Sequence, residues 1–204
     1  MRNEWRTKGV YFFFEPGEKR AAPDAQRIVR IGSHRGETSS IESRIVGEHS
    51  VDWGRSVFRR HVGAALIRKG EFDSAIDSAE REPWARLWFS RVDRGPVHTD
   101  PKNLHPTLHP LHAIVTRTIG SMTLLWVEIP DRNERLELES QCIKLLSNYL
   151  RQEAPIDPPS DTWLGRHALR EEVRRSGLWN QQHVKGGHIP GFLGRFEKAF
   201  RTTN

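Results

Sequence analysis

A glutamate lies within the apolar face of a predicted helix at residues 133–150, NERLELESQCIKLLSNYL. The apolar residues of this face recur at helical spacing: Leu136, Ile143, Leu146 and Leu150. Glu139 falls within the same face, so its carboxylate is directed to the core or to a cleft. A buried carboxylate without a partner is strongly unfavourable. Glu139 therefore requires a proton, a metal ion or an arginine. The alternatives to a catalytic role are an internal salt bridge with Arg44, or a position at the edge of the face from which the side chain reaches solvent.

A tyrosine precedes three phenylalanines in the segment GVYFFFEPGE, near the start of the chain. Residues 9–15 have the aromatic and β-branched composition of a largely buried strand. Tyr11 either extends its hydroxyl to the surface as an ordinary strand residue, or accepts a proton beside a cation that lowers its pKa. Arg30 and Arg44 are the candidates for that cation, and we expect the strand to carry Tyr11 to the rim of a site beside Arg30.

Four histidines gather in residues 98–112, HTDPKNLHPTLHPLH. Three of them follow one another at the spacing of zinc ligands on a helix: His105, His109 and His112. Pro106 and Pro110 interrupt such a helix, and the segment contains no cysteine. We therefore expect a polar loop here in preference to a metal site.

The remaining pattern predicts the elements that position these residues. Residues 9–15 and 27–32 indicate a hairpin, in which alternation places Arg30 on the opposite face from Val29 and Ile31. Arg44 lies on a short helix, between Ile41 and Ile45. Further elements are expected in three places: a helix between the caps Ser56 and Gly70, a helix at 108–120, and a strand at 122–129. Together they predict an α+β fold with a small antiparallel or mixed β-sheet flanked by helices.

The domain organisation follows from where this pattern is lost. Residues 1–150 are predicted to form one domain, with a helical insertion at about 71–107, where no period is sustained. A proline-rich stretch then opens a helical C-terminal extension at 151–204. Because Trp163 and Trp179 lie in this extension, we expect it to pack against the first domain.

Composition limits the partners. The 204 residues carry a net charge of +6, which favours a polyanion and nucleic acid first. The single Cys142 excludes an internal disulfide. The N-terminal MRNEWRTKG lacks the apolar core of a signal peptide, and no run of about 18 apolar residues occurs. We expect a cytoplasmic protein without a membrane partner, and the sequence leaves its oligomeric state open.

The order of these features resembles the GIY-YIG nuclease family. GVY at residues 9–11 is close to the first signature, and RIG at 30–32 retains the last two letters of the second. Helices bearing Arg44 and then Glu139 follow in the family's order, and the tail beginning PPSDTW resembles a C-terminal extension in a bacterial subgroup. The resemblance implies a small sheet with flanking helices that arranges these side chains around one metal ion.

The resemblance also implies roles for five residues. Tyr11 would be the general base or the group that orients the attacking water. Arg44 would neutralise the scissile phosphate, and Glu139 would be the single protein ligand of Mg²⁺ or Mn²⁺. Asn148 is the nearest candidate for an asparagine of the family. Arg30 replaces the tyrosine of the second signature and adds a cation that could hold phosphate or lower the pKa of Tyr11.

The function implied is that of a metal-dependent DNA endonuclease that hydrolyses phosphodiester bonds. One alternative is a catalytically inactive nucleic-acid-binding module of the same fold, because Arg30 replaces a tyrosine and Glu48 occupies the place of a histidine found in some members. Another alternative is a protein-interaction domain, in which the tryptophan-rich insertion and tail bind a partner.

Overall fold

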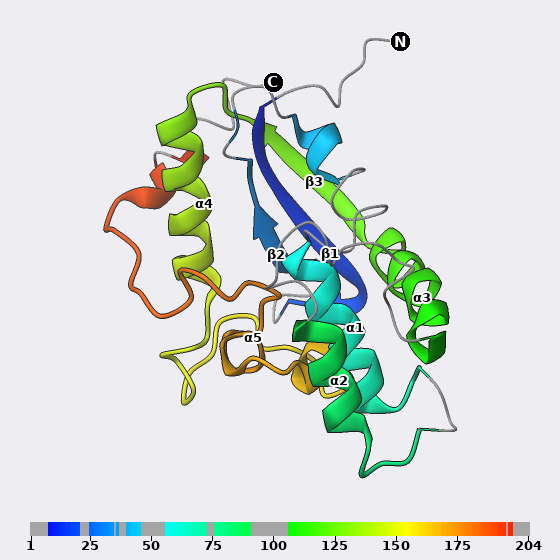
Figure 1. Cartoon of the computed structure of the whole chain (residues 1–204). Coiled ribbons are helices and arrows are strands. Elements are labelled where there is room, and N and C mark those ends of the chain that lie inside the picture. The colour runs from blue at the N-terminus through cyan, green and yellow to red at the C-terminus, as the bar shows by residue number, and fades with distance from the viewer. Residues whose placement is uncertain are drawn as a thin grey trace.

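The structure is a computed structural model that describes residues 8–20, 25–34, 36, 40–45, 56–72, 76–90, 106–194 and 196–197. Its centre is a three-stranded antiparallel sheet in the order β2-β1-β3 (Figure 1). The strands are β1 (Gly9–Lys19), β2 (Gln26–Gly32) and β3 (Thr123–Glu128). The helices are α1 (Val57–Lys69), α2 (Arg81–Ser90), α3 (His109–Gly120), α4 (Arg132–Leu146) and α5 (Glu171–Ser176), with short 3₁₀ turns η5 (Pro106–Leu108) and η6 (Leu164–His167). This architecture confirms the expected α+β class.

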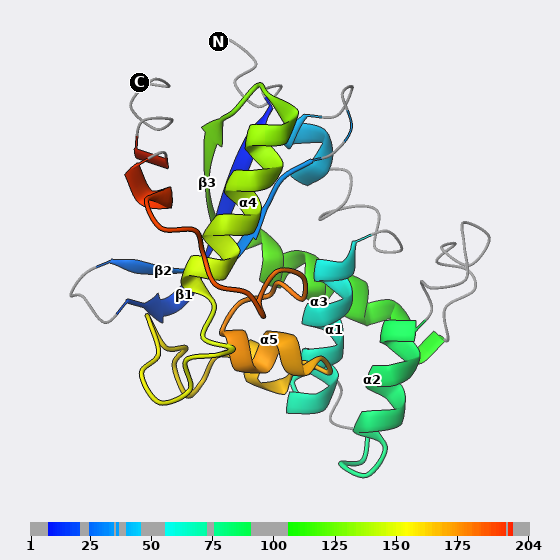
Figure 2. The same ribbon diagram turned by 90° about the vertical axis from the view of Figure 1, so that its left-hand side faces the viewer.

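The sheet separates two apolar clusters. One face packs against a helical layer that contains α1 and α3, and the apolar cluster there includes Tyr11, Phe13 and Phe58. The other face packs against α4, and its cluster includes Val10 and Phe12. Figure 2 shows α4 standing along the sheet, with α1 and α3 placed apart from it. The strict alternation of β1 therefore distributes its aromatic residues between two cores.

A bulge in the hairpin changes which face carries Arg30. The pairing register of β1 and β2 shifts after Phe13, which pairs with Arg30. Val29 lies in the same cluster as Phe13, and the Arg30 guanidinium lies 4.6 Å from the ring centroid of Phe58 in that cluster. Ile31 lies in the other cluster. The expected placement of Arg30 opposite Val29 is therefore wrong, because the extra residue in the bulge interrupts the alternation, whereas its placement opposite Ile31 is confirmed.

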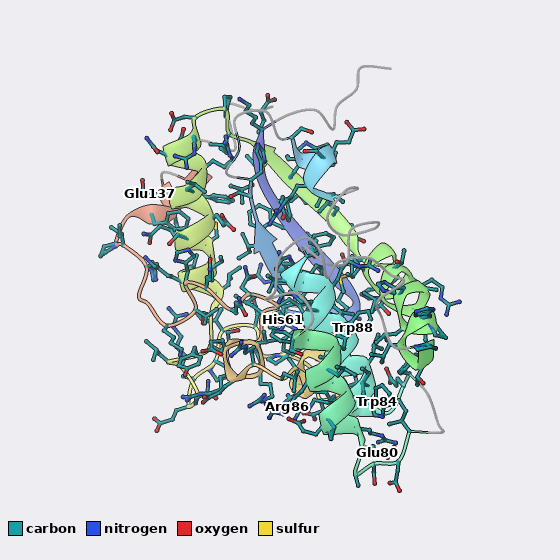
Figure 3. The ribbon with its side chains drawn as sticks, in the orientation of Figure 1. His61, Glu80, Trp84, Arg86, Trp88 and Glu137 are labelled. Atoms are coloured by element: carbon teal, nitrogen blue, oxygen red, sulfur yellow. The ribbon has the colours of Figure 1, made fainter. Side chains whose placement is uncertain are left out.

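The caps predicted for α1 are confirmed. The Ser56 side chain accepts a hydrogen bond from the Arg59 amide, and Gly70 ends the helix in the left-handed conformation at φ 82°. Most of the helix is buried, because α2 covers it on the side away from the sheet: Trp88 of α2 is fully buried beside α1 (Figure 3). Part of the segment expected as an insertion thus contributes to the main core, and the domain division itself stays a prediction.

The face that α4 presents to the core differs from the predicted one. Its buried residues are Arg135, Leu138, Gln141, Cys142 and Ile143. The helix ends at Leu146, and Leu150 lies beyond it with 67% of its surface exposed. The prediction that Leu150 extends the apolar face is therefore wrong. The predicted face differs from the observed one because it was chosen from apolar residues alone. Arg135 is charged but is buried, since it donates hydrogen bonds to backbone carbonyls.

The histidine-rich segment is described by the structure only from residue 106 onward. Residues 91–105 lie outside the described part of the chain, and with them His98 and His105. From residue 106 onward the chain is helical, and Pro110 lies in the first turn of α3, where its missing N–H removes no hydrogen bond. The expected polar loop is therefore wrong for residues 109–112, and the helix expected at 108–120 is confirmed. The ring centroids of His112 and Trp88 lie 5.1 Å apart, and burial lowers the pKa of His112 to about 4.

The C-terminal segment is bound to the hairpin through its tryptophans. Trp163 and Trp179 are 1% and 0% exposed, and their indole N–H groups both donate to Oε2 of Glu15, at 3.0 and 3.1 Å. The backbone N–H of Trp179 also donates to the carbonyl of Val29. This confirms that the tail packs back on the sheet, as its tryptophans predicted.

Glu15 should make stability depend on pH. Burial raises its pKa, and the two indole hydrogen bonds only partly oppose this. As pH rises above the ordinary carboxyl range, the unfolded chain loses this proton first, so the free energy of unfolding should fall until pH passes the raised pKa. Glu15→Gln keeps an acceptor without the charge and should remove this decline. Urea unfolding between pH 4 and pH 8 measures the effect.

The matched control is Glu153→Gln, because Glu153 is exposed. This variant should follow the wild-type profile. A difference between wild type and Glu15→Gln that is constant across the pH range would contradict the assignment.

Candidate functional site

A cavity of about 450 Å³ opens beside the end of β2. Its walls include the end of β2 with the residues that follow it, the start of α1, α4, and the C-terminal segment after α5. The helical turn at 41–45 contributes Arg44, and Ser40 and Ser43 cap this turn through reciprocal hydrogen bonds. Three of the five predicted site residues line the cavity: Arg30, Arg44 and Glu139.

Glu139 is fixed by a partner that the sequence pattern did not indicate. The hydroxyl of Ser33, directly after β2, donates to Oε2 of Glu139 at 2.5 Å. Glu139 is partly buried and lies on the wall of the cavity. The Ser33 hydroxyl thus holds one oxygen of the Glu139 carboxylate in place, and the carboxylate is available to a ligand in the cavity.

Arg30 lies between the buried core and this carboxylate. Burial lowers the pKa of its guanidinium, and Arg44 adds to the lowering by repulsion. Tyr11 and Glu139 act in the opposite direction, and the Tyr11 hydroxyl is hydrogen-bonded to Arg30. Even so, an arginine remains protonated under physiological conditions. Two cations and one carboxylate therefore meet at the cavity, an arrangement that suits an anion bound together with a divalent cation.

Tyr11 is not at the rim of the cavity. Its side chain is 0% exposed, it does not line the cavity, and it reaches the site through Arg30. Tyr11 pairs with Gly32 across the hairpin, and a Cβ atom on Gly32 would lie 2.4 Å from the Tyr11 hydroxyl oxygen. The expected rim position is wrong, because the absence of a side chain at Gly32 leaves room for the Tyr11 ring inside the core.

Asn148 lies away from the cavity. Its Nδ2 donates to the carbonyl of Ile156 at 2.9 Å, and its Oδ1 accepts from the Ile156 amide at 2.6 Å. The asparagine on the cavity wall is Asn180, whose amide makes the same pair of bonds to Ile31: 3.0 Å from the Ile31 N–H and 2.8 Å to its carbonyl. Asn180 thereby ties the tail to the outer edge of β2.

Sequence reasoning missed several residues of this site. Ser33 and His34 follow directly after the RIG signature, and the polar run NQQH at 180–183 follows an apolar Leu-Trp pair. His61 of α1 (Figure 3) is fully buried and does not itself line the cavity. Burial and then the Arg30 charge lower the pKa of His61 to about 3. A change from apolar to polar residues at a strand end was the available signal for Ser33 and His34.

Comparison with known families gives one match. A family model described as the GIY-YIG domain matches residues 1–204, the whole chain. The chain belongs to the GIY-YIG family. Comparison with curated proteins and with solved structures gives no match.

The GIY-YIG assignment agrees with the geometry of the hairpin. The two signatures, at residues 9–11 and 30–32, lie on antiparallel neighbours, and Tyr11 of the first pairs with Gly32 of the second. Membership of the GIY-YIG family indicates a nuclease-type function and hence a nucleic-acid substrate. Within the described residues, no helix has the length and apolarity needed to cross a membrane.

The two asparagines provide a matched pair of variants. Asn180→Asp and Asn148→Asp each lose one donor to a backbone carbonyl, so each should lower the free energy of unfolding by about 1–3 kcal/mol. Only Asn180→Asp places a new negative charge on the cavity wall, so only this variant should weaken nucleic-acid binding. Fluorescence anisotropy, well below both melting temperatures, measures the difference. Equal affinities in the two variants would contradict the assignment of Asn180 to the site.

Proposed function

We propose that the protein is a metal-dependent endonuclease that hydrolyses phosphodiester bonds in DNA. One observation carries this proposal: in a GIY-YIG chain, Glu139 shares a cavity of about 450 Å³ with Arg30 and Arg44. Phosphodiester hydrolysis requires charge neutralisation at phosphorus and stabilisation of the leaving oxygen. Arginines can bind the phosphate, and a carboxylate can hold a divalent ion.

The residues of the cavity fit a hard divalent ion. Mg²⁺ keeps several water ligands and is commonly held by one or two carboxylates together with substrate phosphates. Glu139 supplies a carboxylate, and Gln181 and Gln182, which also line the cavity, carry amide oxygens. Over the described ranges, no cluster of three or more histidine, cysteine or acidic side chains occurs. This donor set suits Mg²⁺ or Mn²⁺ better than it suits zinc.

Each residue then has a role in the reaction. Bound Mg²⁺ or Mn²⁺ supplies Lewis-acid stabilisation of the leaving oxygen and of the charge that develops on the phosphoryl group. Glu139 holds the ion, and the Ser33 hydroxyl orients its carboxylate. Arg44 and Arg30 bind the non-bridging oxygens of the phosphodiester. Because Tyr11 is buried behind Arg30, it serves to position that guanidinium and does not touch water.

The buried position of Tyr11 also favours a second candidate function. If the reaction needs a tyrosine hydroxyl in contact with the attacking water, the protein is a nucleic-acid-binding module that retains the cavity without turnover. The net charge of +6 supports backbone binding in either case.

Cleavage of supercoiled plasmid separates the two functions. The wild-type protein is incubated with Mg²⁺, with Mn²⁺ or with EDTA, and nicked and linear products are measured on gels. Products that depend on the metal are expected for the endonuclease. Intact plasmid in all three conditions, together with DNA affinity that falls as salt is raised, would support the binding module and overturn the endonuclease.

A further inference from the structure

His34 is a buried histidine on the cavity wall. His34 is 2% exposed, and it lines the same cavity as Arg44 and Glu139. Neither ring nitrogen has a hydrogen-bond partner among the residues that the structure describes. A buried imidazole normally has at least one partner, because leaving it unpaired is unfavourable by roughly 1–3 kcal/mol. A molecule that enters the cavity would supply that partner.

The backbone around His34 is held rigidly by α4. The guanidinium of Arg135 is 1% exposed and donates from Nε to the carbonyl of His34 at 3.2 Å. Its Nη1 donates to the carbonyls of Ile129 and Pro130 at 2.8 and 3.0 Å. The preceding residue, Ser33, is bonded to Glu139 of the same helix. The backbone of His34 is therefore fixed relative to Glu139, and its ring makes no hydrogen bond within the described structure.

The surroundings of His34 keep it uncharged. Burial lowers its pKa to about 4, and the nearby charges of Arg135, Lys8 and Arg44 add to this lowering. An uncharged imidazole carries one N–H donor and one acceptor nitrogen. Beside arginines that attract an anion, the N–H is the part of the ring that matches the oxygens of a phosphodiester.

We propose that His34 contacts the substrate, and that its imidazole N–H donates a hydrogen bond to a non-bridging oxygen of the phosphodiester bound beside Arg44. This inference rests on the proposed function, because it takes nucleic acid as the occupant of the cavity. It adds a substrate-binding residue from the segment that follows the second signature. It also supplies a partner for one of the two ring nitrogens that lack partners in the described structure.

Three variants of His34 test the hydrogen bond. His34→Asn and His34→Gln each retain an N–H donor, near the position of one or the other ring nitrogen, whereas His34→Leu removes the donor and keeps the apolar volume. With duplex DNA in EDTA, His34→Leu should bind about 10-fold to 100-fold more weakly than wild type, and at least one amide variant should regain most of the affinity. The bond from Arg135 involves only the backbone of residue 34, so it is retained in all three.

A measurement on the wild-type protein covers the case in which a variant fails to fold. The imidazole ¹⁵N and ¹H resonances of His34, assigned by their loss in His34→Asn or His34→Gln, are followed by NMR while the same duplex is added in EDTA. A shift that saturates with the DNA is expected. Resonances that stay unchanged at saturating DNA, or a His34→Leu protein that is folded and binds as tightly as wild type, would overturn the inference.

The outcome also distinguishes this inference from the proposed function. Cleavage by wild type with unchanged His34 resonances overturns only the inference. Shifted His34 resonances without cleavage under any metal overturn the endonuclease and support the substrate contact. A protein that binds no DNA overturns both.

Discussion

Replacing Glu139 by glutamine should reduce metal-dependent DNA cleavage by about a thousandfold without weakening DNA binding in EDTA. A glutamine has nearly the same shape and can still accept the hydrogen bond from Ser33. It lacks the negative charge that holds the divalent ion, and loss of metal stabilisation of the transition state corresponds to about 4 kcal/mol. Plasmid cleavage rates in Mg²⁺ and in Mn²⁺ measure the effect.

Glu137→Gln is the matched control for this experiment. Glu137 lies on the same helix but is exposed and directed away from the sheet (Figure 3). The control makes the same change of charge to the protein, so it corrects for any effect of net charge on DNA binding. It should cleave at the wild-type rate. Cleavage by Glu139→Gln within a few fold of Glu137→Gln would contradict the role given to Glu139.

Replacing Gly32 by alanine should lower stability and activity together. The new Cβ atom would lie 2.4 Å from both Cζ and the hydroxyl oxygen of Tyr11, so the ring must move from its place against β2. We expect the free energy of unfolding to fall by at least about 2 kcal/mol, as overpacking of a core does. Displacement of Tyr11 also removes its hydrogen bond to Arg30, so cleavage should fall even at temperatures where the protein is folded. Urea unfolding and plasmid cleavage measure the two effects.

A double-mutant cycle assigns this effect to Tyr11. In a Tyr11→Leu background the side chain ends before the atoms that the new Cβ would meet, so Gly32→Ala should cost markedly less stability there. Gly120→Ala is the control, because a Cβ atom at Gly120 meets nothing within 4 Å. A cost of Gly32→Ala that is the same in both backgrounds would show that another contact causes it.

Local features of the fold were predictable from the sequence. The caps of α1 are set by Ser56 and Gly70, within the helix or next to it, so a single short segment contains the whole signal. The hairpin and β3 follow from runs of aromatic and β-branched residues, and the two signatures bring Tyr11 and Gly32 into one pair. The sequence also identified two charged residues of the cavity. Glu139 lies in the apolar pattern of a predicted helix, and Arg44 lies on the helix that follows the hairpin in the order of the family's elements.

Other features depend on contacts between distant segments. The bulge that turns Arg30 toward Phe58 comes from the pairing of two strands, and no residue type in β2 marks it. The core face of α4 includes a buried arginine, which is stable there only because Arg135 binds the carbonyls of Ile129, Pro130 and His34. Hydrogen bonds of this kind cannot be predicted from the spacing of apolar residues.

The sequence by itself determined the class of fold, the family, and the identity of the charged residues at the cavity. Only the tertiary structure decided which other residues join them. Asn180 is bonded to Ile31 across 149 positions of the chain, and this pairing brings the tail onto the cavity wall in place of Asn148. The tertiary structure also places Tyr11 behind Arg30 and places His34 on the cavity wall. Such placements result from long-range packing and hydrogen bonding, and these leave no periodic signal in the sequence.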